Sequence, residues 1–166
     1  MTSGQPEQAA AASTPSTRLA QLGLSLPAVA RPVAAYVPAR RSGNVVYTAG
    51  QLPFVDSALT VTGKVGAEVD PDVAKDAART CALNALAAAA AEAGGLDGVE
   101  KILKVTGFVA SAPDFTGQPA VLDGASELLG EVFGDDAGRH ARSAVGVGVL
   151  PLDAPVEVEL VVAVRD

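Results

Sequence analysis

One segment of the sequence restricts the fold more than any other: an alanine-rich stretch that lies between Asp70 and Gly94-Gly95. Asp70 can cap a helix, Pro71 fits the first helical position, and Asp72 complements the positive end of the helix dipole. The paired glycines predict its end, about 23 residues or ~35 Å later. Its small residues form a narrow face that can lie close on a sheet: Ala74, Ala77, Ala78, Ala82, Ala85 and Ala89.

The composition predicts that the chain associates with other subunits. Hydrophobic residues make up 49 % of the 166 residues, but aromatic residues make up only 4 %. A core of small side chains buries less apolar area per residue, at ~25 cal/mol per Å². Close packing of helix on sheet, or contacts between subunits, must supply the rest. We therefore expect an oligomer.

The composition also excludes several classes of protein. The longest apolar run, residues 85–91, is far shorter than the ~20 residues of a membrane-spanning helix, so no membrane partner is expected. Residues 1–17 lack the basic start and apolar block of a secretory signal, which predicts a cytoplasmic location. One cysteine, Cys81, and one histidine, His140, offer no cluster of metal ligands, so no metal site is expected.

The distribution of charge argues against a nucleic-acid partner. Residues 42–166 carry a net charge of −10, whereas residues 1–41 carry +3. Proteins that bind nucleic acids need clustered basic side chains, usually with aromatic side chains on which bases stack. The main part of this chain would instead repel a phosphate backbone.

The remaining pattern predicts one α+β domain. Residues 1–17 are typical of a disordered lead-in, and residues 18–166 form the domain, beginning with an extended arm over 18–32. A second helix is predicted from Pro119 to about Phe133, ending at Gly134. Because the two helices are segregated from the strands, we expect a two-layer sandwich. The predicted strands are 33–39 and 44–50 around a turn at Arg41-Ser42-Gly43, then 102–110, and finally 141–150 and 156–164 as a hairpin.

Arg142 lies in unusual company on the first of the two final strands. Alternation puts it on one face with Ala144, Gly146 and Gly148. Either a helix packs on these small residues and Arg142 points to solvent, or they form the floor of a site. In the second case the guanidinium at the rim would suit bidentate binding of a carboxylate.

Three further residues each allow a structural and a chemical interpretation. Glu157 and Glu159 share a face of the last strand, as a solvent-facing stripe or as a general base for water. His140 is either a surface loop residue or a group that transfers protons near neutral pH. In the predicted hairpin, Glu157 lies ~20 Å from Arg142, so a site that uses both must combine two subunits.

Three segments together resemble the reactive intermediate deaminase family, also called the Rid or YjgF family. They are Gly43–Pro53, then Ala141-Arg142-Ser143 leading to Leu150-Pro151, then Val156–Glu159. The resemblance extends over residues 33–165 and includes Asp114-Phe115. It implies a chorismate-mutase-like fold with a mixed sheet and two helices on one face, a homotrimer, and clefts between subunits that bind small carboxylates.

The resemblance also implies an activity that needs neither cofactor nor metal. Some members hydrolyse enamines and imines, such as 2-aminoacrylate, to keto acids and ammonia. By position, Arg142 matches the arginine that binds the substrate carboxylate, and Glu157 matches the acidic residue that places the attacking water. Tyr36 matches a tyrosine of the cleft, and Gly50 matches a backbone group near the ligand.

The chain departs from this pattern at four positions. Ala49 replaces a serine, Ala144 replaces a cysteine, His140 replaces a proline, and Pro119 lies where an asparagine is usual. We therefore expect a divergent member in which His140 replaces a lost proton donor, and Ala49 and Ala144 line the substrate site. The leading expectation is hydrolytic deamination of imino and enamino acids. The alternative is a non-enzymatic protein that binds or senses a small carboxylic metabolite.

Overall fold

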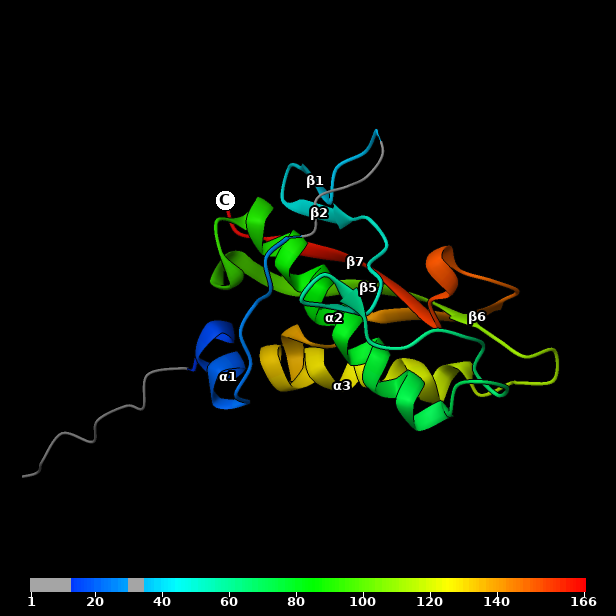
Figure 1. The fold of residues 1–166 in the computed structure, drawn as a ribbon. Coiled ribbons are helices and arrows are strands. Elements are labelled where there is room, and N and C mark those ends of the chain that lie inside the picture. The colour runs from blue at the N-terminus through cyan, green and yellow to red at the C-terminus, as the bar shows by residue number, and fades with distance from the viewer. Residues whose placement is uncertain (1–12, 30–34) are drawn as a thin grey trace, which may run out of the picture.

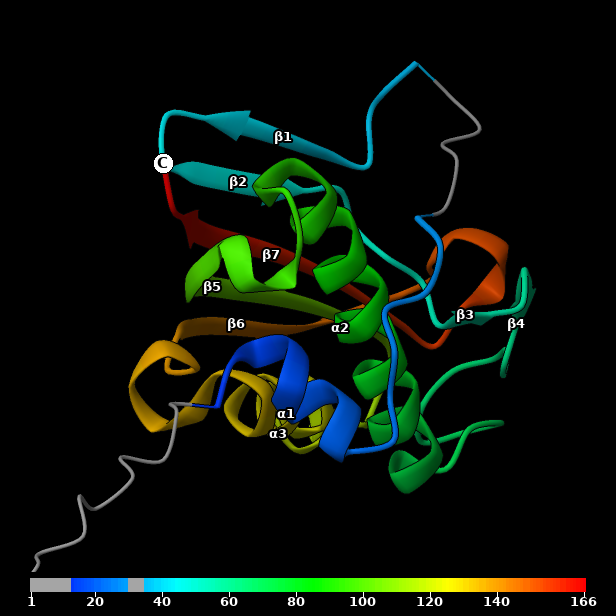
Figure 2. The same ribbon diagram turned by 90° about the vertical axis from the view of Figure 1, so that its left-hand side faces the viewer.

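The structure is a computed structural model that describes residues 13–29 and 35–166. Within this part of the chain, five strands form a sheet in the order β1-β2-β7-β5-β6 (Figure 2). The helices α2 and α3 cover one face of it (Figure 1), which confirms the predicted sandwich with a mixed sheet. The sheet strands are β1 (Ala39–Ser42), β2 (Val45–Thr48), β5 (Val99–Ala110), β6 (Ala141–Val147) and β7 (Val156–Val164), and the helices are α2 (Pro71–Ala93) and α3 (Gln118–Ala137).

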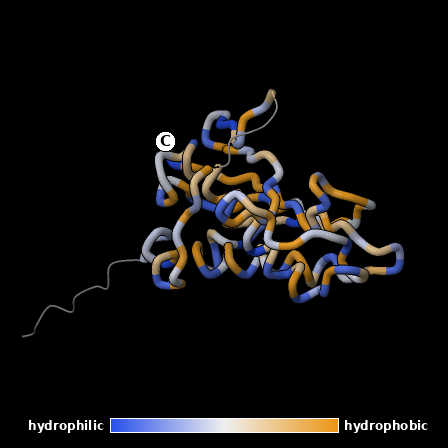
Figure 3. The backbone as a smooth tube through the Cα atoms, viewed as in Figure 1, coloured by the Kyte–Doolittle hydropathy of each residue, from blue (hydrophilic) through white to orange (hydrophobic). Residues whose placement is uncertain are grey.

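Shorter elements surround this frame. They are the helix α1 (Pro15–Gln21), the hairpin strands β3 (Phe54–Val55) and β4 (Ala58–Leu59), and the 3-10 turns η1 (Leu96–Gly98) and η2 (Pro151–Asp153). Hydrophobic residues concentrate along the central strands (Figure 3), whose helix-facing side chains are buried. No helix in the described ranges is long and apolar enough to span a membrane.

The alanine-rich helix α2 has the ends that the sequence predicts. The Asp70 side chain accepts a hydrogen bond from the Asp72 backbone N–H at 2.8 Å, and Gly94 ends the helix in the left-handed region at φ 74°. Residues 85–90 are all buried, so the helix is covered on most of its circumference. Small side chains make this possible because they let neighbouring elements approach the helix axis closely.

Helices α2 and α3 approach each other closely at Gly124. A methyl group added to Gly124 would overlap the backbone carbonyl oxygen of Lys75. Two ion pairs cross the same contact, Lys75 to Glu127 at 2.8 Å and Arg79 to Glu131 at 2.6 Å. From the sequence, a glycine at this position only weakens a helix, but here it allows two helix backbones to meet.

The predicted hairpin between the last two strands is wrong. Strands β6 and β7 do not pair with each other; both pair with β5, β6 in parallel and β7 antiparallel. Their connection contains Pro151 and Pro155, which lack the N–H groups that a tight antiparallel ladder uses. As a result, Glu157 lies opposite Phe108 on β5 rather than near Gly148.

The N-terminal predictions also need correction. Residues 15–21 form helix α1, where the sequence predicts the end of a disordered lead-in and the start of an extended arm. Thr14 caps this helix, and the Asp97 carboxylate accepts hydrogen bonds from the Ser16 N–H at 2.9 Å and its hydroxyl at 2.6 Å. The apolar side chain of Leu19 is buried against the core. The rest of the lead-in, residues 1–12, lies outside the described residues.

Some strand and helix limits differ from those predicted. The first strand is predicted to begin at residue 33 but begins at Ala39; residues 33–34 of the prediction lie outside the described residues. The turn that follows this strand is Gly43-Asn44. Gly43 has the expected positive φ, 59°. In α3, Gly134 breaks the helical backbone at φ 82°, as predicted, but one further turn continues to Ala137.

Candidate functional site

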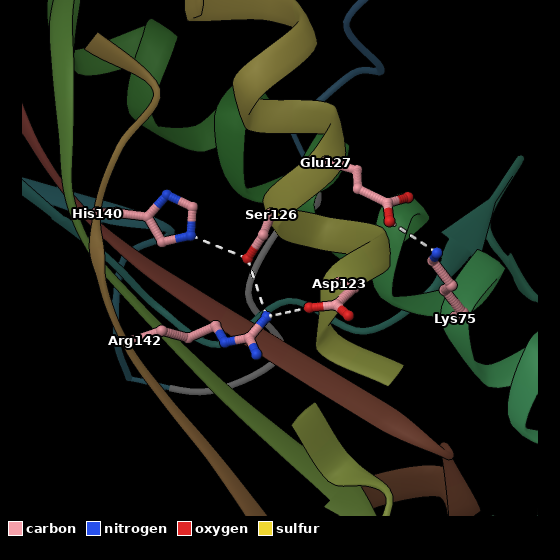
Figure 4. Close-up of polar contacts among 6 residues, drawn as sticks. All are labelled: Lys75, Asp123, Ser126, Glu127, His140 and Arg142. Atoms are coloured by element: carbon pink, nitrogen blue, oxygen red, sulfur yellow. Dashed lines mark hydrogen bonds and ion pairs between the residues drawn. The ribbon is translucent and has the colours of Figure 1, made fainter. Parts of the chain in front are cut away.

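Arg142 extends from the edge strand β6 towards helix α3 (Figure 4). Its Nη1 donates to Asp123 Oδ1 at 2.8 Å and to Ser126 Oγ at 3.1 Å. The Arg142 side chain is 24 % exposed to solvent, and the Asp123 side chain is 49 % exposed. The guanidinium is therefore held in place from one side and accessible to solvent from another.

These two contacts use both hydrogens of Arg142 Nη1. The Nε and Nη2 groups of Arg142 have no acceptor among the described residues. Nε–H and one Nη2–H of a guanidinium point in parallel, which is the arrangement that binds both oxygens of a carboxylate. The geometry thus leaves a bidentate edge of Arg142 free for an anion.

His140 is linked to Arg142 through Ser126. Its Nδ1 lies 2.6 Å from the carbonyl oxygen of Gly138, which can only accept, so Nδ1 carries the hydrogen. In the neutral ring Nε2 then accepts from the Ser126 hydroxyl, at 2.9 Å. Both ring nitrogens are occupied, so in this arrangement His140 orients Ser126 rather than facing a ligand. Its role as a proton donor stays a prediction.

The small residues beside Arg142 serve two different purposes. Ala144 packs against the core under α3, as in helix packing. Gly146 lies beneath the Gln118 amide, whose Nε2 would be 2.7 Å from a Cβ at that position. Gln118 and Gly146 line a depression of about 390 Å³ together with Lys64, Ser111, Ala112, Pro113, Phe115, Val147 and Gly148. The predicted floor of small residues therefore exists only beyond Ala144.

Glu157 lies on the opposite face of the sheet from Arg142. The flanking residues Val156 and Val158 face the helices and are buried. Glu157 and Glu159 therefore point to the uncovered face, which is the face of the sheet opposite α2 and α3. The Glu157 carboxylate packs directly on Gly50, where an added methyl group would overlap it. Burial raises the pKa of the Glu157 carboxyl, and the nearby charge of Glu159 raises it further.

This raised pKa predicts how Glu157→Gln changes stability with pH. A carboxyl whose folded-state pKa exceeds its unfolded value costs nothing at low pH and destabilises the fold as pH rises through both values. Relative to wild type, the variant should gain free energy of unfolding at pH 7, and the gain should shrink towards pH 4. Urea denaturation at the two pH values measures this. An equal effect of the substitution at both would contradict it.

The remaining predicted site residues lie apart from Arg142. Tyr36 is 53 % exposed in the segment before β1. Ala49, whose N–H donates to the Pro38 carbonyl at 2.8 Å, follows β2 beside Gly50. Within one chain, Glu157 is three residues along and two strands across from Arg142, which is about 10 Å in each direction. One chain therefore does not bring these groups together.

Two residues of the Arg142 cluster, Asp123 and Ser126, were not predicted from the sequence. They lie three positions apart on α3, a spacing that puts both on one face of a helix. That spacing is visible in the sequence, but only the parallel pairing of β5 and β6 shows that this face meets Arg142.

The single cysteine lies in the core. Cys81 is buried, and its thiol lies 3.5 Å from the Val156 carbonyl oxygen. Burial raises its pKa well above the ordinary value, as in an inert core thiol. Among residues 13–29 and 35–166, no group of three or more His, Cys, Asp or Glu side chains could hold a metal ion.

Comparisons with known proteins agree on one family. Residues 16–164 match the family model described as "YjgF/chorismate_mutase-like, putative endoribonuclease". Protein TCP17 of Trypanosoma cruzi is 43 % identical over 148 residues, 89 % of this chain and 92 % of that protein. A 2-iminobutanoate/2-iminopropanoate deaminase of Dermatophagoides farinae is 32 % identical over 86 % of this chain and 95 % of its own length.

A solved structure shows the same fold. The Agrobacterium tumefaciens protein Atu1372, described as having unknown function, superimposes with a TM-score of 0.83 and 44 % identity. The match covers 91 % of this chain and 92 % of that one. The family model, the related sequences and the shared fold together show that the chain belongs to the YjgF, or Rid, family.

Proposed function

We propose that this protein hydrolyses small imino and enamino acids, such as 2-aminoacrylate, to keto acids and ammonia. The observation that carries the proposal is the free bidentate edge of Arg142, held in place by Asp123 and Ser126. A substrate carboxylate bound there would be fixed on an edge strand, next to the small residue Ala144. The likeness to the deaminase of Dermatophagoides farinae supports the same chemistry.

The proposed site combines two copies of the chain in a homotrimer. Arg142 and Glu157 point to opposite faces of one sheet, so a single substrate cannot contact both within one chain. The uncovered face carries exposed apolar side chains, including Tyr47 at 52 % and Val145 at 42 %. Burying this face against neighbouring copies would supply the apolar contacts that the alanine-rich core lacks.

In the proposed mechanism, Arg142 of one copy binds the carboxylate and Glu157 of the next places a water molecule. Water adds to the carbon of the protonated C=N bond, and Glu157 accepts the proton that water loses. The Glu157 carboxyl then returns the proton to nitrogen. As the C–N bond breaks, the added hydroxyl oxygen forms the C=O bond and gives its proton to the Glu157 carboxylate, which passes it to the departing ammonia. Its raised pKa favours this exchange because a carboxyl that holds a proton more readily is a better base and relay.

A second function is non-enzymatic binding of a small carboxylic metabolite. The observation that favours it is the loss of two polar side chains, because Ala49 and Ala144 stand where a serine and a cysteine are usual in the family. Arg142 would serve this function equally well. We place either function in the cytoplasm. Nucleic acid is not proposed as a partner, despite the wording of the family description, because residues 42–166 carry a net charge of −10.

Keto-acid release separates the two functions. An amino-acid oxidase generates imines from several amino acids in turn, and the rate of their conversion to keto acid and ammonia is followed with and without the protein. The deaminase proposal predicts acceleration by catalytic amounts of protein. If no substrate reacts faster than in buffer while carboxylates still bind, the protein binds its ligand without turnover.

A further inference from the structure

We propose that His140 and Ser126 are positioning residues of the Arg142 site, which fix the guanidinium in the orientation that binds a ligand carboxylate. In this role His140 acts through hydrogen bonds alone and transfers no proton to the substrate. The inference rests on the proposed function, because it takes Arg142 as the group that binds the carboxylate. It explains how an arginine on an edge strand is held ready for its ligand.

A chain of hydrogen bonds runs from the end of α3 to Arg142. It begins at Gly138, whose carbonyl oxygen accepts from His140 Nδ1 at 2.6 Å. Gly138 is itself buried, and its N–H donates to the Gly134 carbonyl oxygen at 2.9 Å. A methyl group added to Gly138 would lie 2.6 Å from that oxygen, so the backbone is tightly packed here. The carbonyl that holds the imidazole is therefore fixed in place.

Ser126 connects the imidazole to Arg142 (Figure 4). Its hydroxyl has one hydrogen, which it donates to His140 Nε2 at 2.9 Å. The Ser126 oxygen then presents a lone pair to Arg142 Nη1, at 3.1 Å. Without an acceptor at His140, a serine hydroxyl in a helix can turn to a backbone carbonyl of the preceding turn. His140 therefore determines the direction in which the Ser126 lone pair points.

Two acceptors on Nη1 hold the plane of the Arg142 guanidinium. Asp123 Oδ1 accepts from the same nitrogen at 2.8 Å. A guanidinium held by one bond can rotate about it, whereas a second acceptor on the other hydrogen of Nη1 stops this motion. The free edge of Nε–H and Nη2–H lies in the same plane, because the guanidinium is rigid. A ligand carboxylate therefore binds without the entropy cost of ordering a long side chain.

The chain of contacts provides a matched pair of substitutions at one position. His140→Gln places an amide oxygen near the position of Nε2, where it accepts from Ser126. His140→Asn has a shorter side chain, which reaches the Gly138 carbonyl but not Ser126. Ser126→Ala removes the middle of the chain. His140 and Ser126 are both half-buried, so these substitutions disturb little packing, and thermal denaturation verifies that each variant is folded.

The probe is propionate, titrated by NMR, because it carries a carboxylate but undergoes no reaction that needs a proton donor. Ser126→Ala and His140→Asn should each weaken its binding by about fivefold, which corresponds to roughly one hydrogen bond. His140→Gln should stay within about twofold of wild type, because it restores the acceptor. Combining His140→Asn with Ser126→Ala should weaken binding no further than Ser126→Ala does, because both changes break the same chain.

Imine hydrolysis separates positioning from proton transfer. In His140→Asn, KM should rise by about fivefold while kcat stays within about twofold of wild type, because the substrate and its transition state lose the same contact. Loss of a proton donor would instead lower kcat and leave propionate binding unchanged. That second result would overturn the positioning role of His140.

The other possible failures are also distinguishable. If Ser126→Ala or His140→Asn binds propionate like wild type, if their effects add, or if His140→Gln is as weak as His140→Asn, the positioning role is overturned and the carboxylate site stands. If wild type binds no propionate, or if Arg142→Ala leaves binding unchanged, the carboxylate site and the proposed function with it are overturned.

Discussion

Replacing Arg142 with alanine is expected to lower kcat/KM for imine hydrolysis by at least about 100-fold. The variant loses two charge-assisted hydrogen bonds to the substrate carboxylate, each worth about 1.5 kcal/mol or more, and about 1.4 kcal/mol corresponds to a factor of ten. It also leaves Asp123 without its cation, which adds repulsion against any anionic substrate. Initial rates of keto-acid release over a range of imine concentrations measure the effect.

Two further variants show whether the loss arises from the geometry of the guanidinium. Arg142→Lys keeps the charge but not the planar pair of donors, so its loss should be intermediate. Arg139→Ala is the control, because Arg139 is a neighbouring arginine that is exposed and forms no ion pair among the described residues. This variant should retain wild-type rates. Activity of Arg142→Ala within about twofold of wild type would show that the carboxylate binds elsewhere.

Gly124→Ala is expected to destabilise the fold by about 2 kcal/mol, although alanine favours helices over glycine. The added methyl group overlaps the Lys75 carbonyl oxygen, which belongs to a helix backbone and cannot rotate away. The two helices must separate, and the buried alanines of α2 lose contacts. In a domain of this size, the melting temperature should fall by about 4–8 °C.

Gly130→Ala is the control for this effect, because it lies in the same helix with nothing within 4 Å of the added Cβ. It should stabilise the protein by about 0.5–1 kcal/mol through helix propensity alone. Urea denaturation at one fixed protein concentration compares the two variants, since association would shift apparent stability. Two changes of the same sign would refute the close helix contact as the reason for Gly124.

The elements that the sequence predicts best are those fixed by local chemistry. Helix α2 begins and ends where Asp70, Pro71 and Gly94 place it, because caps and left-handed glycines act within one turn of the helix. The two-layer architecture follows from the order of the elements. Helix α1 was missed because its seven residues carry little periodic signal, and its contacts come from Asp97, which is 81 residues away from Ser16.

Strand neighbours were less predictable, because alternation assigns the faces of a strand but not its partners. The faces of β6 and β7 are as predicted, whereas their pairing with β5 depends on the position of α3. The same reason limits the site. Arg142 could be singled out from its small neighbours, but Asp123 and Ser126 became part of the cluster only through the crossover that α3 makes between β5 and β6.

The position of β7 determines when the sheet can be completed during synthesis. This strand, residues 156–164, is the middle one of five, yet it follows all the others along the chain. Until β7 leaves the ribosome, the β1–β2 hairpin has no strand to join. The edge of β5 that faces away from β6 also stays unpaired. Pairing of Val45 with Ala163 closes a loop that spans nearly the whole described domain, which slows folding. We therefore expect nascent chains that lack these residues to depend on chaperones, since their exposed strand edges favour aggregation.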